Sequence, residues 1–182
     1  MDKKQKVGNL TIEILDFFLG IPEAIVSGFD RKGFYRIMQG MPAEKSLTVS
    51  NICKIFHSFK KSGYIEIINA NQNESIRFTN KAQLAIIDKL AERHKTDNKY
   101  CLISFDIPEK FRSNRDKFRR VIKRMGFCQI QKSLWVCDRS VGWLIELAAK
   151  EYRVSDYVVY IISERTNIDQ TIPQLLAKRI SR

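Results

Sequence analysis

The sequence has few residues that could build a metal or redox site. It contains only two histidines, His57 and His94, and four cysteines, and no two cysteines form a CxxC pair. This scarcity argues against a zinc site with Cys and His ligands, which needs several such residues at close spacing. The cysteines lie inside apolar runs, so we expect buried, reduced thiols, as is usual in the cytoplasm.

A long uncharged apolar run is also missing. The best candidate, residues 10–26, contains Glu13, Asp16 and Glu23. These charges do not suit a bilayer-spanning helix or the apolar part of a signal peptide. We therefore expect a cytoplasmic protein that does not enter a membrane. The sequence has no P-loop, no GxGxxG after a strand, no GxSxG and no HExxH, so it predicts no enzyme of those classes.

Acidic residues are outnumbered. The chain has 20 Asp and Glu against 32 Lys and Arg, a net charge of +12. Such an excess favours a polyanionic partner, either nucleic acid or an anionic membrane surface; a basic surface that serves only solubility is the simpler alternative. Residues 1–98 carry +4 and residues 99–182 carry +8, with a polar run at 93–99 between them. We predict two domains, 1–97 and 98–182.

The first domain shows helical periodicity that changes to strand periodicity after Gly63. Asp30 and Thr48 can cap helices, Gly63 can end one, and Asn80 with Gln83 has the spacing of a capping box. The pattern predicts helices near 10–18, 30–38, 49–59 and after 80, and strands at 64–68 and 75–79 joined by a polar turn. This order is typical of a winged helix-turn-helix.

The second domain reads as strand, helix, two strands, helix, strand. Residues 100–105 form a continuous apolar run, and 111–125 form an amphipathic helix that Gly126 ends. Residues 127–137 are extended, as a hairpin or as one bent strand. The remaining predictions are a helix at 141–152 with Ser140 as a cap, a strand at 156–162 and a short helix after Pro173. The whole chain is thus predicted to be α+β, with a ferredoxin-like βαββαβ second domain.

Two stretches of the second domain carry a family resemblance. Residues 104–109 (SFDIPE), and 126–127 with 131–136 (GF and QKSLWV), resemble the PaaX-type family of bacterial transcriptional repressors. The middle domain of that family resembles the CRISPR-associated Cas-two proteins. The resemblance covers roughly residues 45–162. It implies a winged helix for DNA, a ferredoxin-like module that pairs subunits, and repression as the output.

The sequence departs from these patterns in two respects. Asp106 agrees with the Cas-two pattern, but Pro108 and Glu109 follow the repressor pattern instead. PaaX-type repressors generally carry a further C-terminal domain, and only residues 163–182 follow the last predicted strand. We therefore expect a short form of the family. The sequence does not show whether the protein binds a small-molecule effector or which compound that would be.

The second helix of a helix-turn-helix enters the major groove and meets base edges with its outward residues. Asn51 can bond adenine in bidentate fashion, and Lys54 can reach guanine or a phosphate. The alternative is that this face is only solvated. The predicted base contacts are Thr48, Ser50, Asn51, Lys54 and Ser58. The predicted contacts with the DNA backbone, including the wing, are Lys60, Lys61, Asn71, Gln72, Asn73 and Arg77.

One such helix would discriminate weakly, so we predict a homodimer, paired through residues 98–182, on a palindromic site in double-stranded DNA. The helix at 111–125 is strongly basic and is either a second DNA surface or a solvated face. The residues predicted for this secondary surface are Arg112, Arg115, Arg119, Arg120 and Lys123.

Asp106 carries the alternative function. In Cas-two-like proteins an aspartate at the end of the first strand can hold a divalent metal across the dimer axis. Asp106 has that position, which leaves open a weak Mg²⁺-dependent nuclease or a CRISPR adaptation protein with a fused winged helix. The simpler interpretation is that Asp106 bonds backbone groups before Pro108 or pairs with an arginine. We therefore predict no cofactor, with Mg²⁺ at Asp106 as the alternative.

Overall fold

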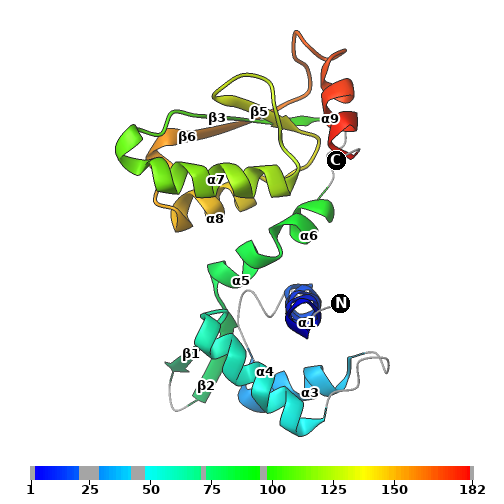
Figure 1. The fold of residues 1–182 in the computed structure, drawn as a ribbon, viewed down its shortest axis with the longest axis vertical. Helices are drawn as coiled ribbons and strands as arrows, with labels where there is room; N and C mark the ends of the chain where they lie inside the picture. Colours follow the sequence, from blue (N-terminus) through cyan, green and yellow to red (C-terminus); the bar gives the residue numbers. More distant parts are fainter. Residues whose placement is uncertain (1–2, 21–28, 42–47, 71–72, 95–97, 181–182) are drawn as a thin grey trace. The chain divides into compact units, whose positions relative to one another are not determined.

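The computed structural model describes residues 3–20, 29–41, 48–70, 73–94 and 98–180. The chain forms two units, Met1–Ile86 and Ile87–Arg182. Figure 1 shows helices around a two-stranded sheet in the first unit and a four-stranded sheet with helices in the second. Helix and sheet are therefore mixed, as predicted. The domain limits of 1–97 and 98–182 stay a prediction.

The first unit begins with helices and continues with a β-hairpin. Its elements are α1 (Lys3–Leu19), α3 (Arg31–Gln39), α4 (Val49–Ser62), β1 (Ile65–Ala70), β2 (Asn73–Phe78) and α5 (Asn80–Ala85). The strands are antiparallel, and pairing continues to Ala70 opposite Asn73. The predicted turn at 69–74 was therefore too long, because polar residues at these positions still pair through their backbones.

Aromatic rings fill the core of the first unit. Phe18 is fully buried. Its ring stacks on Phe34 at 4.9 Å and lies 5.1 Å from the ring of Phe78. An isolated bridge joins Phe29 to Ile76, so the segment before α3 pairs with β2. The hydrophobic face of each helix and the hairpin thus meet in one cluster.

Most of the predicted helix ends are confirmed. The Asp30 carboxylate accepts a hydrogen bond from the backbone N–H of Gly33, and Thr48 accepts one from Asn51. Gly63 and Gly126 end α4 and α7 with φ of 69° and 99°, a left-handed conformation that glycine adopts without steric cost.

Two predicted caps are wrong. Thr79, and not Asn80, caps α5 by accepting a hydrogen bond from Ala82, and the predicted partner Gln83 is buried instead. The residue before α8 is Val141, which makes no side-chain cap bond, so Ser140 does not cap that helix. In both places tertiary packing selects the helix start within a residue or two, which local sequence does not resolve.

The second unit has the order α6 (Ile87–Glu92), β3 (Tyr100–Phe105), a 3₁₀ turn (Glu109–Phe111), α7 (Arg112–Met125), β4 (Cys128–Gln129), β5 (Leu134–Cys137), α8 (Gly142–Glu151), a second 3₁₀ turn (Ser155–Tyr157), β6 (Val158–Ser163) and α9 (Ile172–Ile180). The spatial order of the strands is β4-β5-β3-β6, and all neighbours are antiparallel. The open question over 127–137 is thereby answered by two short paired strands. The strand predicted at 156–162 starts later, at Val158.

The sheet of the second unit has one face toward the helices. Alternate residues of β3 (Cys101, Ile103 and Phe105) are buried, as expected when one face of a sheet is covered. Figure 1 shows α7 and α8 together on one face of this sheet. On the edge strand β6, Val159 and Ile161 are 61% and 58% exposed. None of the described helices is long and apolar enough to cross a membrane.

The cysteines differ in accessibility, which predicts their reactivity. Cys101 and Cys137 face each other across β3 and β5 and are fully buried, whereas Cys53 and Cys128 are half-buried. Burial also raises the pKa of the Cys137 thiol, which lowers its thiolate content. We expect DTNB to modify Cys53 and Cys128 in the folded protein and to reach Cys101 and Cys137 only after unfolding. Equal rates at all four thiols would contradict this packing.

Candidate nucleic-acid interface

Helix α4 presents a polar face outward. Ile52, Phe56 and Phe59 are buried on its inner side. The five predicted base-contact residues, Thr48, Ser50, Asn51, Lys54 and Ser58, are all exposed. The hydroxyl oxygen of Thr48 accepts the capping bond from the Asn51 N–H at 3.4 Å, so Thr48 also serves the helix end. The structure therefore brings these five residues to one accessible end and side of the helix.

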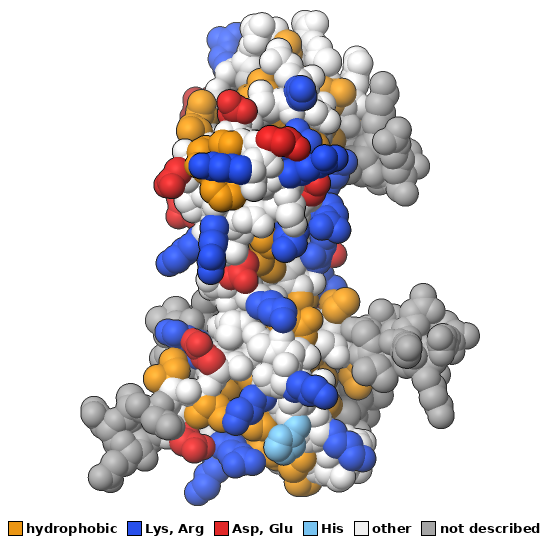
Figure 2. Space-filling view, turned by 60° about the vertical axis from the view of Figure 1, so that its left-hand side comes forward, with side chains coloured by type: hydrophobic (Ala, Val, Ile, Leu, Met, Phe, Trp, Pro, Cys, Tyr) orange, Lys and Arg blue, Asp and Glu red, His pale blue; other side chains and the backbone are white. Residues whose placement is uncertain are grey.

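One apolar residue of α4 lies away from the buried side. Val49 precedes Ile52 by three residues, a spacing that would place it on the apolar side, yet it is 57% exposed in the first turn. A methyl-bearing side chain at this position can contact the C5-methyl group of thymine. His57 is exposed and lies on the same side as Ser50, Lys54 and Lys61, and successive members of this row are three or four positions apart. Figure 2 shows Lys and Arg side chains gathered around a histidine on the first unit.

Helix α4 is held against α3 by polar as well as apolar contacts. The Tyr35 hydroxyl and the Cys53 thiol lie 3.1 Å apart, within hydrogen-bond distance. This hydrogen bond raises the pKa of Tyr35, because it favours the protonated phenol. The guanidinium of Arg31 lies 5.3 Å from the centre of the Phe56 ring. These contacts fix the orientation of α4 and so of its exposed side.

The predicted backbone contacts divide into three groups. Lys60 and Lys61 are exposed at the end of α4. Arg77 pairs with Glu66 on the neighbouring strand at 2.7 Å, so its charge is partly neutralised. Asn71 and Gln72 lie outside the described residues, and of Asn73 only its place at the start of β2 is described.

The basic residues of α7 form two rows, where the sequence predicted one surface. Arg112, Arg115, Arg119 and Lys123 recur every three or four residues along one side, and Lys117, Arg120 and Arg124 along another. Several of these cations have partners in the chain. Arg112 and Arg115 pair with Glu109, Arg120 donates to the Asp116 carbonyl, Lys123 lies over the Trp135 ring, and Arg124 pairs with Asp88.

Asp106 is exposed at the end of β3. Its backbone N–H donates to the Tyr157 carbonyl, but within the described part of the chain its carboxylate has neither a hydrogen bond nor an ion pair. The predicted pairing with backbone groups or an arginine is thus not seen. Glu109, which follows Pro108, takes that role, and Arg115 beside it lowers the pKa of its carboxyl.

The carboxylate of Asp106 lies among cations of its own chain. Mg²⁺ prefers carboxylate, phosphate and water oxygens. Asp106 shares a pocket with the cations Arg115, Arg119 and Lys132, and the Glu109 carboxylate there is taken up by arginines. Among the residues described, no three His, Cys, Asp or Glu side chains gather as metal ligands. The positive charges of Arg119 and Lys132 disfavour a divalent cation beside the one free carboxylate of Asp106.

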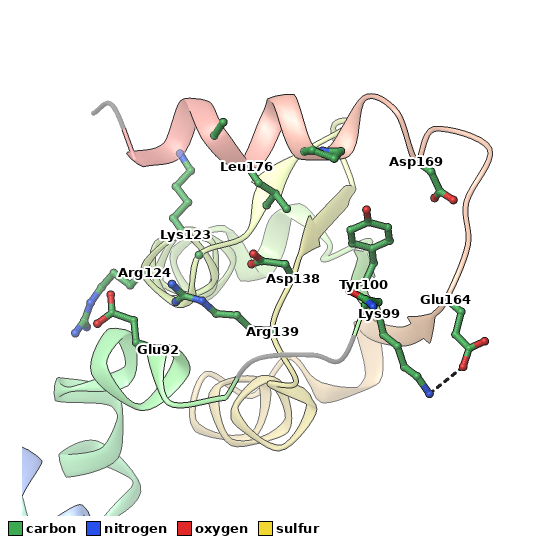
Figure 3. Close-up of a pocket in the computed structure, with 14 residues that line it drawn as sticks. Glu92, Lys99, Tyr100, Lys123, Arg124, Asp138, Arg139, Glu164, Asp169 and Leu176 are labelled. Atoms are coloured by element: carbon green, nitrogen blue, oxygen red, sulfur yellow. Dashed lines mark ion pairs between the residues drawn. The ribbon is translucent and has the colours of Figure 1, made fainter.

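One pocket of the second unit, of about 1240 Å³, lies between the start of β3, the end of α7 and α9. Figure 3 shows charged side chains of both signs on its walls. Lys99 pairs with Glu164 at 3.0 Å, and Arg139 donates to the Met125 carbonyl at 3.1 Å. Asp169 accepts hydrogen bonds from Thr166. Because these charges have partners in the chain, the pocket gives no support to an effector site.

The second unit defines a class: a β-α-β-β-α-β domain whose antiparallel sheet is covered by two helices on one face. Residues 93–175 match the family model of the PaaX protein central Cas2-like domain. This match supports the resemblance to the PaaX-type family that residues 104–109 and 126–136 had indicated. No curated protein and no solved structure gives a significant match to the chain.

Proposed function

We propose that this protein is a cytoplasmic, sequence-specific regulator of transcription that binds double-stranded DNA. In this proposal residues 1–97 act as a winged helix-turn-helix, and residues 98–182 act as a ferredoxin-like domain that pairs two subunits. The observation that carries this proposal is the exposed polar side of α4, held by α3 and followed by the β1–β2 hairpin. The PaaX-type family supports transcription regulation, with repression as the expected output.

In this proposal, α4 enters the major groove with its N-terminal end foremost. Asn51 reads adenine through its amide, Lys54 reaches guanine or a phosphate, and Val49 contacts a thymine methyl. Lys60 and Lys61 contact phosphates and fix the register of the helix without reading sequence. The hairpin supplies further contacts with the DNA backbone.

One α4 offers too few base contacts for strong discrimination, so two copies act together on a palindrome. The second unit is the module proposed to pair them. The exposed apolar residues Val159 and Ile161 on the edge strand β6 support this role, since exposed apolar side chains that gather on one strand are typical of interaction surfaces.

The proposal is tested by titrating the full-length protein against the DNA upstream of its own gene and against scrambled DNA, at near-physiological salt and with Mg²⁺ present. We expect a discrete complex of two chains per site, a clear preference for the upstream DNA, and intact DNA. Equal binding to both DNAs would contradict sequence-specific regulation, and a single chain per site would contradict the dimer.

The Mg²⁺ in that titration also tests the alternative function. We propose no catalytic residue and no cofactor, because Asp106 lies among cations that disfavour a divalent metal. Mg²⁺-dependent cleavage of the DNA that is lost in Asp106→Ala would instead assign a nuclease, or a CRISPR adaptation protein with nuclease activity, to the second unit.

A further inference from the structure

A second pocket of the second unit lies where β3 ends and α7 begins. It has a volume of about 560 Å³ and is lined by Asp106, Arg115, Arg119, Lys132 and Ser133, among others. We call it the Arg119 pocket. Its volume falls in the range of pockets that bind small molecules, and most of its lining residues are polar or charged.

Arg119 has no acceptor of its own in the described part of the chain. Its guanidinium lies 5.7 Å from the centre of the Phe105 ring, and its Nε atom is buried without a hydrogen-bond partner. The Nε atom of Arg115 is in the same condition. Burying a hydrogen-bond donor of a charged side chain costs free energy unless the donor finds an acceptor. The two arginines therefore indicate an acceptor that the protein does not provide.

The charges around this pocket do not cancel. The Glu109 carboxylate forms ion pairs with Arg115 at 2.9 Å and with Arg112 at 3.6 Å, and these pairs neutralise its charge. The remaining charged groups on the wall are the cations Arg119 and Lys132 and the single carboxylate of Asp106. Two cations attract an oxyanion, whereas a carboxylate accepts hydrogen bonds from hydroxyl groups.

We propose that the Arg119 pocket binds a small phosphate ester that also carries hydroxyl groups, such as a sugar phosphate. The phosphate lies against Arg119 and Lys132, and a hydroxyl donates to the Asp106 carboxylate. The site belongs to the second unit and does not depend on DNA binding by α4. A duplex is the less suitable source of phosphate, because the Nε atom of Arg119 is buried and a rigid double helix contacts exposed surfaces.

Calorimetric titration of the full-length protein with ribose 5-phosphate, inorganic phosphate and ribose tests this proposal. We expect saturable 1:1 binding of ribose 5-phosphate, weaker binding of inorganic phosphate and none of ribose. Arg119→Gln and Lys132→Gln should each weaken ribose 5-phosphate binding by about tenfold or more, since each removes a charge-assisted hydrogen bond. Asp106→Asn should weaken binding of ribose 5-phosphate more than binding of inorganic phosphate.

Arg120→Gln is the matched control, because Arg120 lies in the other row of α7 and is exposed. It should change the affinity by less than about twofold. Lys132 is exposed, so its variant stays informative if Arg119→Gln does not fold. If neither ribose 5-phosphate nor inorganic phosphate shows saturable binding at millimolar concentration, the proposal is overturned. An equal loss in Arg120→Gln, or an effect of Arg119→Gln on duplex DNA alone, would overturn it as well.

Discussion

Replacing both Asn51 and Lys54 with Ala is expected to lower the affinity for the upstream DNA by about 100-fold or more and to leave binding to scrambled DNA much less affected. The reason is that each good base contact contributes about 1–3 kcal/mol of discrimination, and a dimer loses it twice. Both side chains are exposed on α4, so the variant should fold normally. Fluorescence anisotropy at fixed salt measures the two affinities.

Lys150→Ala is the control for the loss of charge. Lys150 is exposed on α8, in the other unit of the chain, and its loss should change the affinity for either DNA by less than about twofold. The single variants separate the two roles. Lys54→Ala should reduce the salt dependence of binding, and Asn51→Ala should not. An unchanged preference for upstream DNA in the double variant would remove α4 as the reading helix.

Phe18→Ala is expected to destabilise the first unit by about 3–5 kcal/mol, the usual cost of deleting a buried aromatic side chain. Phe18 is fully buried and its ring contacts those of Phe29, Phe34 and Phe78. The cavity would lie where α1, α3 and β2 meet. Because α4 packs in the same unit, DNA binding should weaken as the unfolded fraction rises. Urea denaturation followed by circular dichroism measures the loss of stability.

The neighbouring Phe17→Ala variant is the matched control. Phe17 is the same residue type on the same helix, but it is 37% exposed. Its loss should cost about 1 kcal/mol or less. If the two variants lose similar stability, the aromatic cluster is not the core of the first unit.

Much of the fold could be predicted from local patterns. The α4 helix follows from its apolar spacing, the Thr48 cap and the stop at Gly63, because each acts through bonds within a few residues. The caps of α5 and α8 could not be predicted, since several neighbouring residues have similar propensity there. The extended run 127–137 left two choices, and pairing of β5 with β3 and β4 selects the two-strand arrangement.

The candidate site was predictable in part. The outward residues of α4 follow from periodicity. Periodicity does not show at which residue of a helix the packing against other elements begins, so it does not reveal that Val49 in the first turn is exposed. The pairing of Arg77 with Glu66 depends on the strand register. The pairing of Arg124 with Asp88 joins residues 36 positions apart, which no local pattern indicates.

The sequence alone determined the mixed α+β class, the positions of most helices and strands, the basic character of the chain and the resemblance that the PaaX central-domain match bears out. These properties depend on composition and on interactions between close neighbours. Only the tertiary structure decided which charges are neutralised. It pairs Glu109 with Arg115. Among the described residues it leaves the Asp106 carboxylate without a donor and the Arg119 Nε atom without an acceptor, and it collects these groups in one pocket. Such pairings depend on distances between side chains brought together by folding, and a linear pattern carries no such distances.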